Sequence, residues 1–137
     1  MPIFVKDIMS KPVFKIEENK SIKDAANLIK KIRRGFLVVT RKGSPVGVLS
    51  DSDIIRNVVA KNYIPSRTKI KSVMTHHFVS ISSGEEMINA VRKMKKGNVH
   101  RLPVIDNNKI VGVISLTDIA RTSPEMPAAS WLRASPR

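Results

Sequence analysis

The chain contains an internal repeat, and this feature limits its possible folds more than any other. The stretch GVISLTD, from Gly112 to Asp118, has a near-copy, GVLSDSD, from Gly47 to Asp53, which lies 65 positions earlier. With that offset, residues 5–56 align on residues 70–121 without a gap, and 15 of the 52 positions are identical. Chance would give roughly three identities at average composition. The chain is therefore two copies of one unit.

Each copy predicts the same order of elements, β-α-β-β-α. The first long helix begins after Ser21, a suitable N-cap, and the second follows Ser83-x-x-Glu86, which has the form of a capping box. Gly35 and Gly97 suit the ends of these helices. The predicted extended pieces and strands are Val13–Ile16, Phe36–Thr40, Val46–Ser50, Phe78–Ile81, Leu102–Ile105 and Ile110–Ser115, and a short helix follows from Asp51 and from Leu116.

This order predicts an α+β fold with layers of helix and sheet. The predicted organisation is a first repeat over residues 5–57, a linker over 58–69, a second repeat over 70–122 and a flexible tail over 123–137. The tail holds Trp131, which either stays loose or docks on a surface; a loose side chain is the expected state.

Composition excludes several classes of protein. The 137 residues include no Cys, which rules out disulfides, Cys-based zinc sites and thiol nucleophiles. The sequence begins without the apolar run of a signal peptide and has no 18-residue apolar segment, so we expect a cytoplasmic protein that does not span a membrane.

The net charge is +14, from 25 basic and 11 acidic residues. Such a surface attracts nucleotides, nucleic acid or acidic lipid headgroups without choosing between them, and a solvated basic face is the alternative. Few aromatic residues are present, which argues against stacking of nucleic-acid bases. Basic residues cluster at the ends of the two long helices, at Lys30, Lys31, Arg33, Arg34, Lys93, Lys95 and Lys96.

The repeated unit resembles the cystathionine-β-synthase (CBS) domain, and the doubled unit resembles the tandem pair called a Bateman module. The similarity is carried by VKDIMSKPV, PVGVLSDSDIIR, IKSVMTHHFVSI and VHRLPVIDNNKIVGVISLTDIAR, and it covers residues 5–121. The resemblance implies two repeats related by pseudo-twofold symmetry, with their sheets packed together and helices outside. It also implies two clefts that often bind AMP, ADP, ATP or S-adenosylmethionine, and association into a homodimer.

The chemistry of Ser-x-x-Asp agrees with a nucleotide ligand. A strand that turns into a helix presents backbone N–H groups to an anion. The hydroxyls of Ser115 and Thr117, with Arg101 and His100, can donate to phosphate oxygens. Asp118 would repel a phosphate but can accept from both hydroxyls of a ribose.

The resemblance divides the predicted site residues between two clefts. We expect the first cleft to bind more tightly than the second, and it joins the residues around Ser-x-x-Asp of the second copy to the opening loop of the first copy. Its predicted residues are Ser115, Thr117, Asp118, Arg101, His100, Ser10, Lys11, Pro12, Val13, Phe14, Gly35 and Phe36. The second cleft comprises Ser50, Ser52, Asp53, Thr75, His76, His77, Phe78 and Val79. It lacks a His-Arg pair of its own, because Gly35 and Phe36 stand at the positions of His100 and Arg101.

Each motif also has a simpler interpretation. Ser-x-x-Asp at the start of a helix is an ordinary N-cap with an acid in the first turn. His76 and His77 lack a clear third metal ligand, so we predict no metal site. No nucleophile-base pair, pair of convergent carboxylates or phosphate-binding loop is present, so we predict no enzymatic activity and no required cofactor.

The sequence thus predicts a non-enzymatic regulatory module that senses an adenine nucleotide or S-adenosylmethionine. Ligand binding to this module would change its interaction with a protein partner or the arrangement of a homodimer. The alternative is a basic CBS pair that binds nucleic acid or an acidic protein partner and has no nucleotide ligand.

Overall fold

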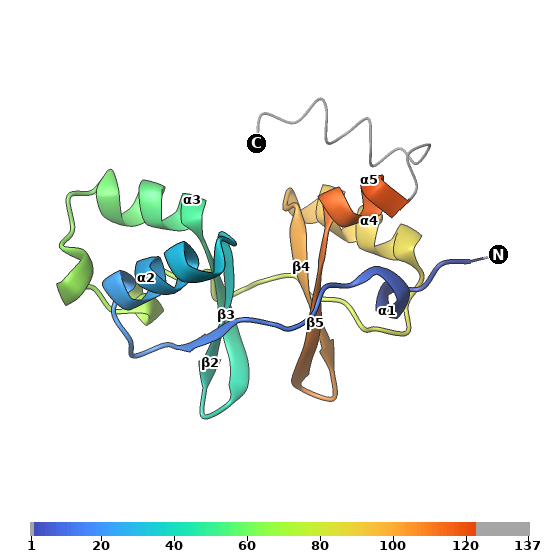
Figure 1. The fold of residues 1–137 in the computed structure, drawn as a ribbon, viewed down its shortest axis with the longest axis horizontal. Coiled ribbons are helices and arrows are strands. Elements are labelled where there is room, and N and C mark those ends of the chain that lie inside the picture. The colour runs from blue at the N-terminus through green and yellow to red at the C-terminus, as the bar shows by residue number, and fades with distance from the viewer. Residues whose placement is uncertain (1, 123–137) are drawn as a thin grey trace. The chain divides into compact units, whose positions relative to one another are not determined.

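The computed structural model describes residues 2–122, and the predicted tail with Trp131 lies outside the described residues. The chain forms two compact units, shown in Figure 1. Unit 2 is Phe14–Phe78, and the described part of unit 1 combines residues 2–13 with residues 79–122. Each unit is described below by itself.

Unit 2 has the predicted order β-α-β-β-α. Strand β1 (Lys15–Glu17) runs parallel to β2 (Phe36–Arg41), which pairs antiparallel with β3 (Ser44–Ser50). Helix α2 (Ile22–Ile32) connects β1 to β2. The elements after β3 are α3 (Asp51–Ile54), a π-helical turn η1 (Ile55–Val59) and two 3-10 turns, η2 (Pro65–Arg67) and η3 (Ile70–Ser72).

Unit 1 repeats this pattern with one element missing. Its elements are α1 (Val5–Ile8), α4 (Met87–Gly97), β4 (Arg101–Asp106), β5 (Lys109–Ser115) and α5 (Leu116–Thr122). Strands β4 and β5 pair antiparallel, with an irregularity between Val104 and Ile105 that matches the one between Val39 and Thr40 in unit 2. The offset of 65 therefore holds for the boundaries of α2, β2 and β3 and even for the bulge.

The extended piece predicted at Phe78–Ile81 does not form a regular strand, because only Ile81 makes an isolated parallel bridge, to Val104. The cause is Pro103. In unit 2 the N–H of Val38 donates to Phe14 O at 3.1 Å. Pro103 stands at the matching position and has no N–H to donate, so the ladder loses the bond that would extend it.

The predicted helix ends are partly right. Ser21 caps α2, since its Oγ accepts from Asp24 N at 3.1 Å and its N–H donates to Asp24 Oδ2 at 3.2 Å. The capping box at Ser83 is wrong: α4 begins at Met87 after Glu86, whose side chain makes no cap bond. The prediction of glycine helix ends is right for Gly97, the last residue of α4, but α2 ends at Ile32, before Gly35. The left-handed C-cap residues are Arg33 (φ 57°) and Asn98 (φ 52°) and not glycines.

Each opening segment joins the core of the unit built from the other copy. Val5, from the start of the first repeat, is fully buried in the core of unit 1. Ile70 and Met74, from the start of the second repeat, are buried in the core of unit 2. The sequence repeats and the compact units therefore divide the chain at different places.

Two glycines allow these segments to approach. A Cβ on Gly112 would lie 2.6 Å from Met9 Sδ, and one on Gly47 would lie 2.7 Å from Met74 Sδ and 3.0 Å from Thr75 O. Glycine without a side chain lets the methionine lie against the strand.

Across residues 2–122 no helix has the length and apolar character needed to cross a membrane.

Candidate functional site

The opening loop of the first repeat is fixed to the end of β5 in unit 1. Ser10 N donates to Val113 O at 2.7 Å, and Val113 N donates to Ser10 O at 3.2 Å. Further back, Val5 N donates to Glu85 O at 2.9 Å. This pairing brings residues from both copies to the junction between β5 and α5.

A hydroxyl and a carboxylate meet at that junction. Ser10 Oγ donates to Asp118 Oδ2 at 3.2 Å across 108 residues of sequence. Arg121 Nη1 lies 3.6 Å from Asp118 Oδ1, and the Asp118 side chain is 22% exposed. Because a carboxylate accepts several hydrogen bonds, Asp118 can exchange the neutral donor Ser10 for a hydroxyl of a ligand.

The capping interpretation is also correct. Asp118 N donates to Ser115 Oγ at 3.0 Å, and in unit 2 Asp53 N donates to Ser50 Oγ at 3.1 Å while Ser50 N donates to Asp53 Oδ2 at 2.9 Å. Both serines therefore cap short helices. Capping uses each serine oxygen as an acceptor, which leaves the hydroxyl hydrogen to donate.

Unit 1 gathers most of the residues predicted for the first cleft. Arg101 is the cross-strand partner of Ser115, and Leu116 N donates to His100 O at 2.8 Å. Thr117 is exposed in the first turn of α5. Lys11, Pro12 and Val13 follow Ser10 within the same unit, whereas Phe14, Gly35 and Phe36 belong to unit 2, so their part in this cleft stays a prediction.

The matching junction in unit 2 has the same backbone but different side chains. Thr75 N donates to Val48 O at 2.9 Å and Val48 N donates to Thr75 O at 3.1 Å, as Ser10 and Val113 do in unit 1. Thr75 is exposed, and Ser52 follows Asp51 in the first turn of α3. Phe36 is the cross-strand partner of Ser50.

Sequence reasoning missed Asp51. Its N–H donates to Gly35 O at 2.9 Å, and a Cβ on Gly35 would lie 2.1 Å from Asp51 Oδ2. Unit 1 has His100 and the buried Leu116 at these two positions. The signal was available, because a glycine and an acid replace a histidine and a leucine in the aligned repeats. The extra carboxylate makes this junction less suited to a phosphate than the one in unit 1.

The remaining residues predicted for the second cleft are the consecutive His76, His77, Phe78 and Val79, and their part in a cleft stays a prediction. His76 Nε2 lies 3.1 Å from Lys71 O, His77 is exposed, and Phe78 ends unit 2. Val79 belongs to unit 1. Within residues 2–122, no three His, Asp or Glu side chains lie close enough together to hold a metal ion.

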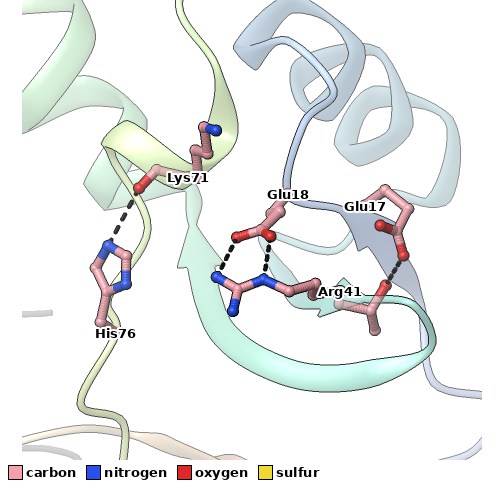
Figure 2. Close-up of polar contacts among 6 residues, drawn as sticks. Glu17, Glu18, Arg41, Lys71 and His76 are labelled. Atoms are coloured by element: carbon pink, nitrogen blue, oxygen red, sulfur yellow. Dashed lines mark hydrogen bonds and ion pairs between the residues drawn. The ribbon is translucent and has the colours of Figure 1, made fainter.

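A polar cluster lies at the second opening segment, and Figure 2 shows its ion pair between Glu18 and Arg41 and the bond of His76 to Lys71 O. Glu18 forms a bidentate ion pair with Arg41, and Glu18 O accepts from Lys71 N at 2.9 Å. The hydrogen bond from Arg41, with the charges of Arg41, Lys71 and His76, holds the pKa of Glu18 below its usual range despite the opposing effect of burial.

Unit 1 uses different chemistry at the matching place. Ser83 O accepts from Lys6 N at 3.0 Å, while Ser83 Oγ and Ser83 N donate to Asp106 at 2.5 and 3.0 Å. These two bonds, from the hydroxyl and then the N–H of Ser83, lower the pKa of Asp106. Ser83 and Asp106 thus replace Glu18 and Arg41, which explains why Ser83 does not cap α4.

Glu18→Gln is expected to lower the thermal midpoint at pH 7, because the substitution removes the ion pair that depresses the pKa of Glu18. A carboxylate whose pKa is lower in the folded protein stabilises the fold at pH values above the pKa it has in the unfolded chain, about 4.3. This stabilisation is lost as the pH falls through the pKa of the carboxylate in the folded protein. The difference in midpoint between variant and wild type should therefore shrink toward pH 3. Scanning calorimetry at pH 7 and pH 3 measures it.

Glu86→Gln is the matched control, since Glu86 is exposed and makes no side-chain cap bond. Its midpoint should follow the wild type at both pH values. Equal midpoints of Glu18→Gln and wild type at pH 7 would show that the ion pair adds no stability.

Comparison with known proteins agrees with this geometry. The profile of the CBS domain matches the chain twice, over residues 5–60 and 70–125. The CBS domain-containing protein YhcV of Bacillus subtilis is 32% identical over 116 residues, which cover 85% of this chain and 82% of that protein. L-aspartate semialdehyde sulfurtransferase of Methanocaldococcus jannaschii is 32% identical over 119 residues, and this chain spans only 22% of its length.

A solved structure is similar throughout. The CBS domain pair of protein MJ0100, in complex with 5-methylthioadenosine and S-adenosyl-L-methionine, is 30% identical and superimposes with a TM-score of 0.81 over 89% of this chain and 96% of the other. The doubled profile match, the relatives and this likeness lead to one assignment. The chain belongs to the CBS domain family and is a tandem pair of CBS domains.

Proposed function

We propose that this CBS pair is a regulatory module that binds an adenine nucleoside or nucleotide at the Ser10–Asp118 junction of unit 1. The observation that carries the proposal is the hydrogen bond between Ser10 Oγ and Asp118 Oδ2 at 3.2 Å. It joins a hydroxyl of the opening loop to a partly exposed carboxylate, two groups that can separate to admit a ribose. The crystallised ligands of the MJ0100 pair, 5-methylthioadenosine and S-adenosyl-L-methionine, support a ligand of this class.

In the proposed complex the ligand is divided between two groups of residues. Asp118 accepts from the ribose hydroxyls in place of Ser10, while Ser115, Thr117, His100 and Arg101 donate to phosphate oxygens when the ligand has them. We propose that the adenine ring lies against the opening loop, at Ser10, Lys11, Pro12, Val13 and Phe14, and that Gly35 and Phe36 close this slot. AMP, ADP, ATP and S-adenosylmethionine are the candidate ligands.

The proposed action is regulation without catalysis. A ligand that binds one arrangement of the molecule more tightly than another shifts the population toward that arrangement. We propose that a protein partner or a homodimer of CBS pairs in the cytoplasm responds to this shift. The weaker second cleft, which contains Asp53, would bind with lower affinity or not at all.

Asp118→Asn is expected to weaken binding of the tightest adenine ligand by about tenfold or more, since a hydrogen bond to a charged acceptor is replaced by one to a neutral amide. Asparagine has nearly the same shape, so the packing of α5 is kept. Isothermal titration calorimetry with AMP, ATP, 5-methylthioadenosine and S-adenosylmethionine measures the affinity of wild type and variant.

Asp53→Asn is the matched control, because Asp53 has the same capping role in the other copy. Its affinity should stay within about threefold of the wild type. The proposed function would be refuted if none of the four ligands gave a heat of binding at millimolar concentration. An equal loss of ligand affinity in Asp118→Asn and Asp53→Asn would contradict a site in unit 1.

A further inference from the structure

The positive charge of the chain is concentrated in unit 2. Unit 2 has 14 basic and five acidic residues, a net charge of +9, whereas the described part of unit 1 has nine basic and five acidic residues, a net charge of +4. The field of such a surface attracts an anionic partner to unit 2 more strongly than to unit 1. Within unit 2, five of the cations gather at one end.

Three segments of unit 2 bring these cations together: the turn after β1, the tip of the β2–β3 hairpin and the start of the second repeat. Lys71 N donates to Glu18 O at 2.9 Å, and Glu18 N donates to Thr40 O at 3.0 Å, so the turn is bonded to both other segments. Figure 2 shows Glu18, Arg41 and Lys71 on these segments. We call this surface the basic end of unit 2, and its cations are Lys20, Arg41, Lys42, Lys69 and Lys71.

Four of these five cations are not paired with a carboxylate of the fold. Arg41 forms the ion pair with Glu18, and its side chain is still 62% exposed. Within residues 2–122, no ion pair is formed by the exposed side chains of Lys20, Lys42, Lys69 and Lys71. An anionic partner can therefore approach these lysines without breaking an ion pair.

The other acidic residues nearby are occupied by groups of the fold. Glu17 Oε2 accepts from Thr40 Oγ1 at 2.8 Å, and Asp24 Oδ2 accepts from Ser21 N at 3.2 Å in the cap of α2. Residues 17–24, 41–44 and 67–72 together contain seven basic and three acidic residues. A net charge of +4 therefore remains at this end when every acidic residue is counted.

The repeat shows that the fold does not require these charges. Glu85 and Asp106 stand in the second copy at the positions of Lys20 and Arg41, so acidic residues replace two of the cations. Unit 1 still forms its β4–β5 hairpin, and Ser83 bonds to Asp106 there at 2.5 and 3.0 Å. The basic end is thus a property of unit 2 and not of the repeated fold.

The basic end also lies away from the Ser50–Asp53 junction of the same unit. Strand β3 runs from Ser44, at the hairpin tip, to Ser50, a rise of about 20 Å at the spacing of a strand. In Figure 1 the hairpin tip and α3 lie at opposite ends of β3. A partner at the basic end therefore leaves that junction free.

We propose that the basic end of unit 2 binds the phosphate backbone of a nucleic-acid duplex without reading its sequence. The lysine ammonium groups pair with phosphates as point charges, and the release of counterions from the duplex drives the binding. This inference goes beyond the proposed function, because it needs no adenine ligand and uses none of the residues assigned to one.

The composition of this surface favours a nucleic acid over an acidic segment of a protein. In residues 2–122, the large apolar side chains that are more than half exposed all lie between residues 55 and 64, outside the segments of the basic end. A protein partner obtains most of its affinity from apolar and aromatic contacts, whereas a phosphate backbone needs cations alone. A single strand would also need aromatic side chains on which to stack its bases, so we expect a duplex.

The test measures fluorescence anisotropy with two labelled 20-base-pair DNA duplexes of unrelated sequence. The wild type should bind both with affinities within about threefold of each other, since phosphate contacts carry no sequence information. The logarithm of its binding constant should fall with the logarithm of the salt concentration with a slope of about −4, for four contacted phosphates. Lys20→Gln combined with Lys71→Gln should weaken binding about tenfold or more at about 50 mM salt and make the slope shallower by about two.

Lys95→Gln combined with Lys96→Gln is the matched control, since it makes the same change of charge at the exposed end of α4 in unit 1. Its affinity for the duplex should stay within about twofold of the wild type. Asp118→Asn should also bind the duplex as the wild type does, which separates this proposal from the ligand site. The thermal midpoint of the Lys20→Gln, Lys71→Gln variant by circular dichroism should match the wild type, because both side chains are exposed and form no ion pair within residues 2–122.

Three results would overturn the proposal. The first is no binding of either duplex by the wild type at about 50 mM salt. The second is an equal loss of affinity in the two double variants, which would reduce the effect to the net charge of the whole molecule. The third is a glutamate 20-mer that displaces the labelled duplex better than unlabelled duplex does at equal concentration of charge, which would assign the basic end to an acidic protein segment.

Discussion

Leu102→Ala is expected to lower the free energy of unfolding by about 2–5 kcal/mol. Leu102 is fully buried on β4, in a core that also contains Ile114 and Leu116. Truncation to alanine removes three buried carbon atoms and leaves a cavity that the surrounding side chains fill only in part. Urea unfolding followed by circular dichroism measures the loss.

Leu37→Ala is the companion variant, because Leu37 is fully buried at the same position of the first repeat. The repeat predicts a loss in the same range. Lys96→Ala, on the exposed end of α4, should change the free energy of unfolding by no more than about 0.5 kcal/mol. A loss under about 1 kcal/mol for Leu102→Ala would contradict the described core.

Gly112→Val is expected to lower the free energy of unfolding by about 1–3 kcal/mol, although valine is the better strand former. Its Cβ would lie 2.6 Å from Met9 Sδ and 3.2 Å from Met9 Cβ, so the opening segment must move away from β5. Hydrogen exchange should therefore quicken at the amides of Ser10 and Val113, which bond to each other across this contact.

Gly84→Val is the matched control, because a Cβ at Gly84 would meet no atom within 4 Å. It should leave the exchange of Ser10 and Val113 unchanged. A Gly112→Val variant that exchanged these amides at the wild-type rate would show that the opening segment does not depend on the close approach of Met9.

The repeat made most of the fold predictable. One offset of 65 relates α2 to α4, β2 to β4 and β3 to β5, and each copy inherits the same hydrophobic spacing. The N-cap at Ser21 was also predictable, because its partner Asp24 is three residues away. Local signals of this kind are sufficient when the atoms that satisfy them are close in sequence.

The errors came from partners that are distant in sequence. Ser83 has the spacing of a cap, but its hydroxyl and N–H are taken by Asp106, 23 residues away. The strand before α4 is missing because Pro103, on another strand, has no N–H to extend the ladder. Asn98 rather than Gly97 is left-handed, since asparagine tolerates that conformation.

The candidate site was predictable in its residue types but not in its contacts. Ser115 and Asp118 could be singled out from the repeated motif, yet the motif cannot say which copy supplies the opening loop, since the two copies have similar apolar residues there. The hydrogen bond between Ser10 and Asp118 settles this for unit 1. Asp51 was not predicted as a site residue because it lies between Ser50 and Asp53 of the shared motif, at a position where the second copy has the apolar Leu116.

A crystal structure of the protein grown with its tightest adenine ligand would test the central claim most directly. Our account predicts ribose hydroxyls within hydrogen-bond distance of the Asp118 carboxylate, with the Ser10 hydroxyl moved away from Asp118 Oδ2. A ligand ordered elsewhere while Ser10 still bonds to Asp118 would contradict it.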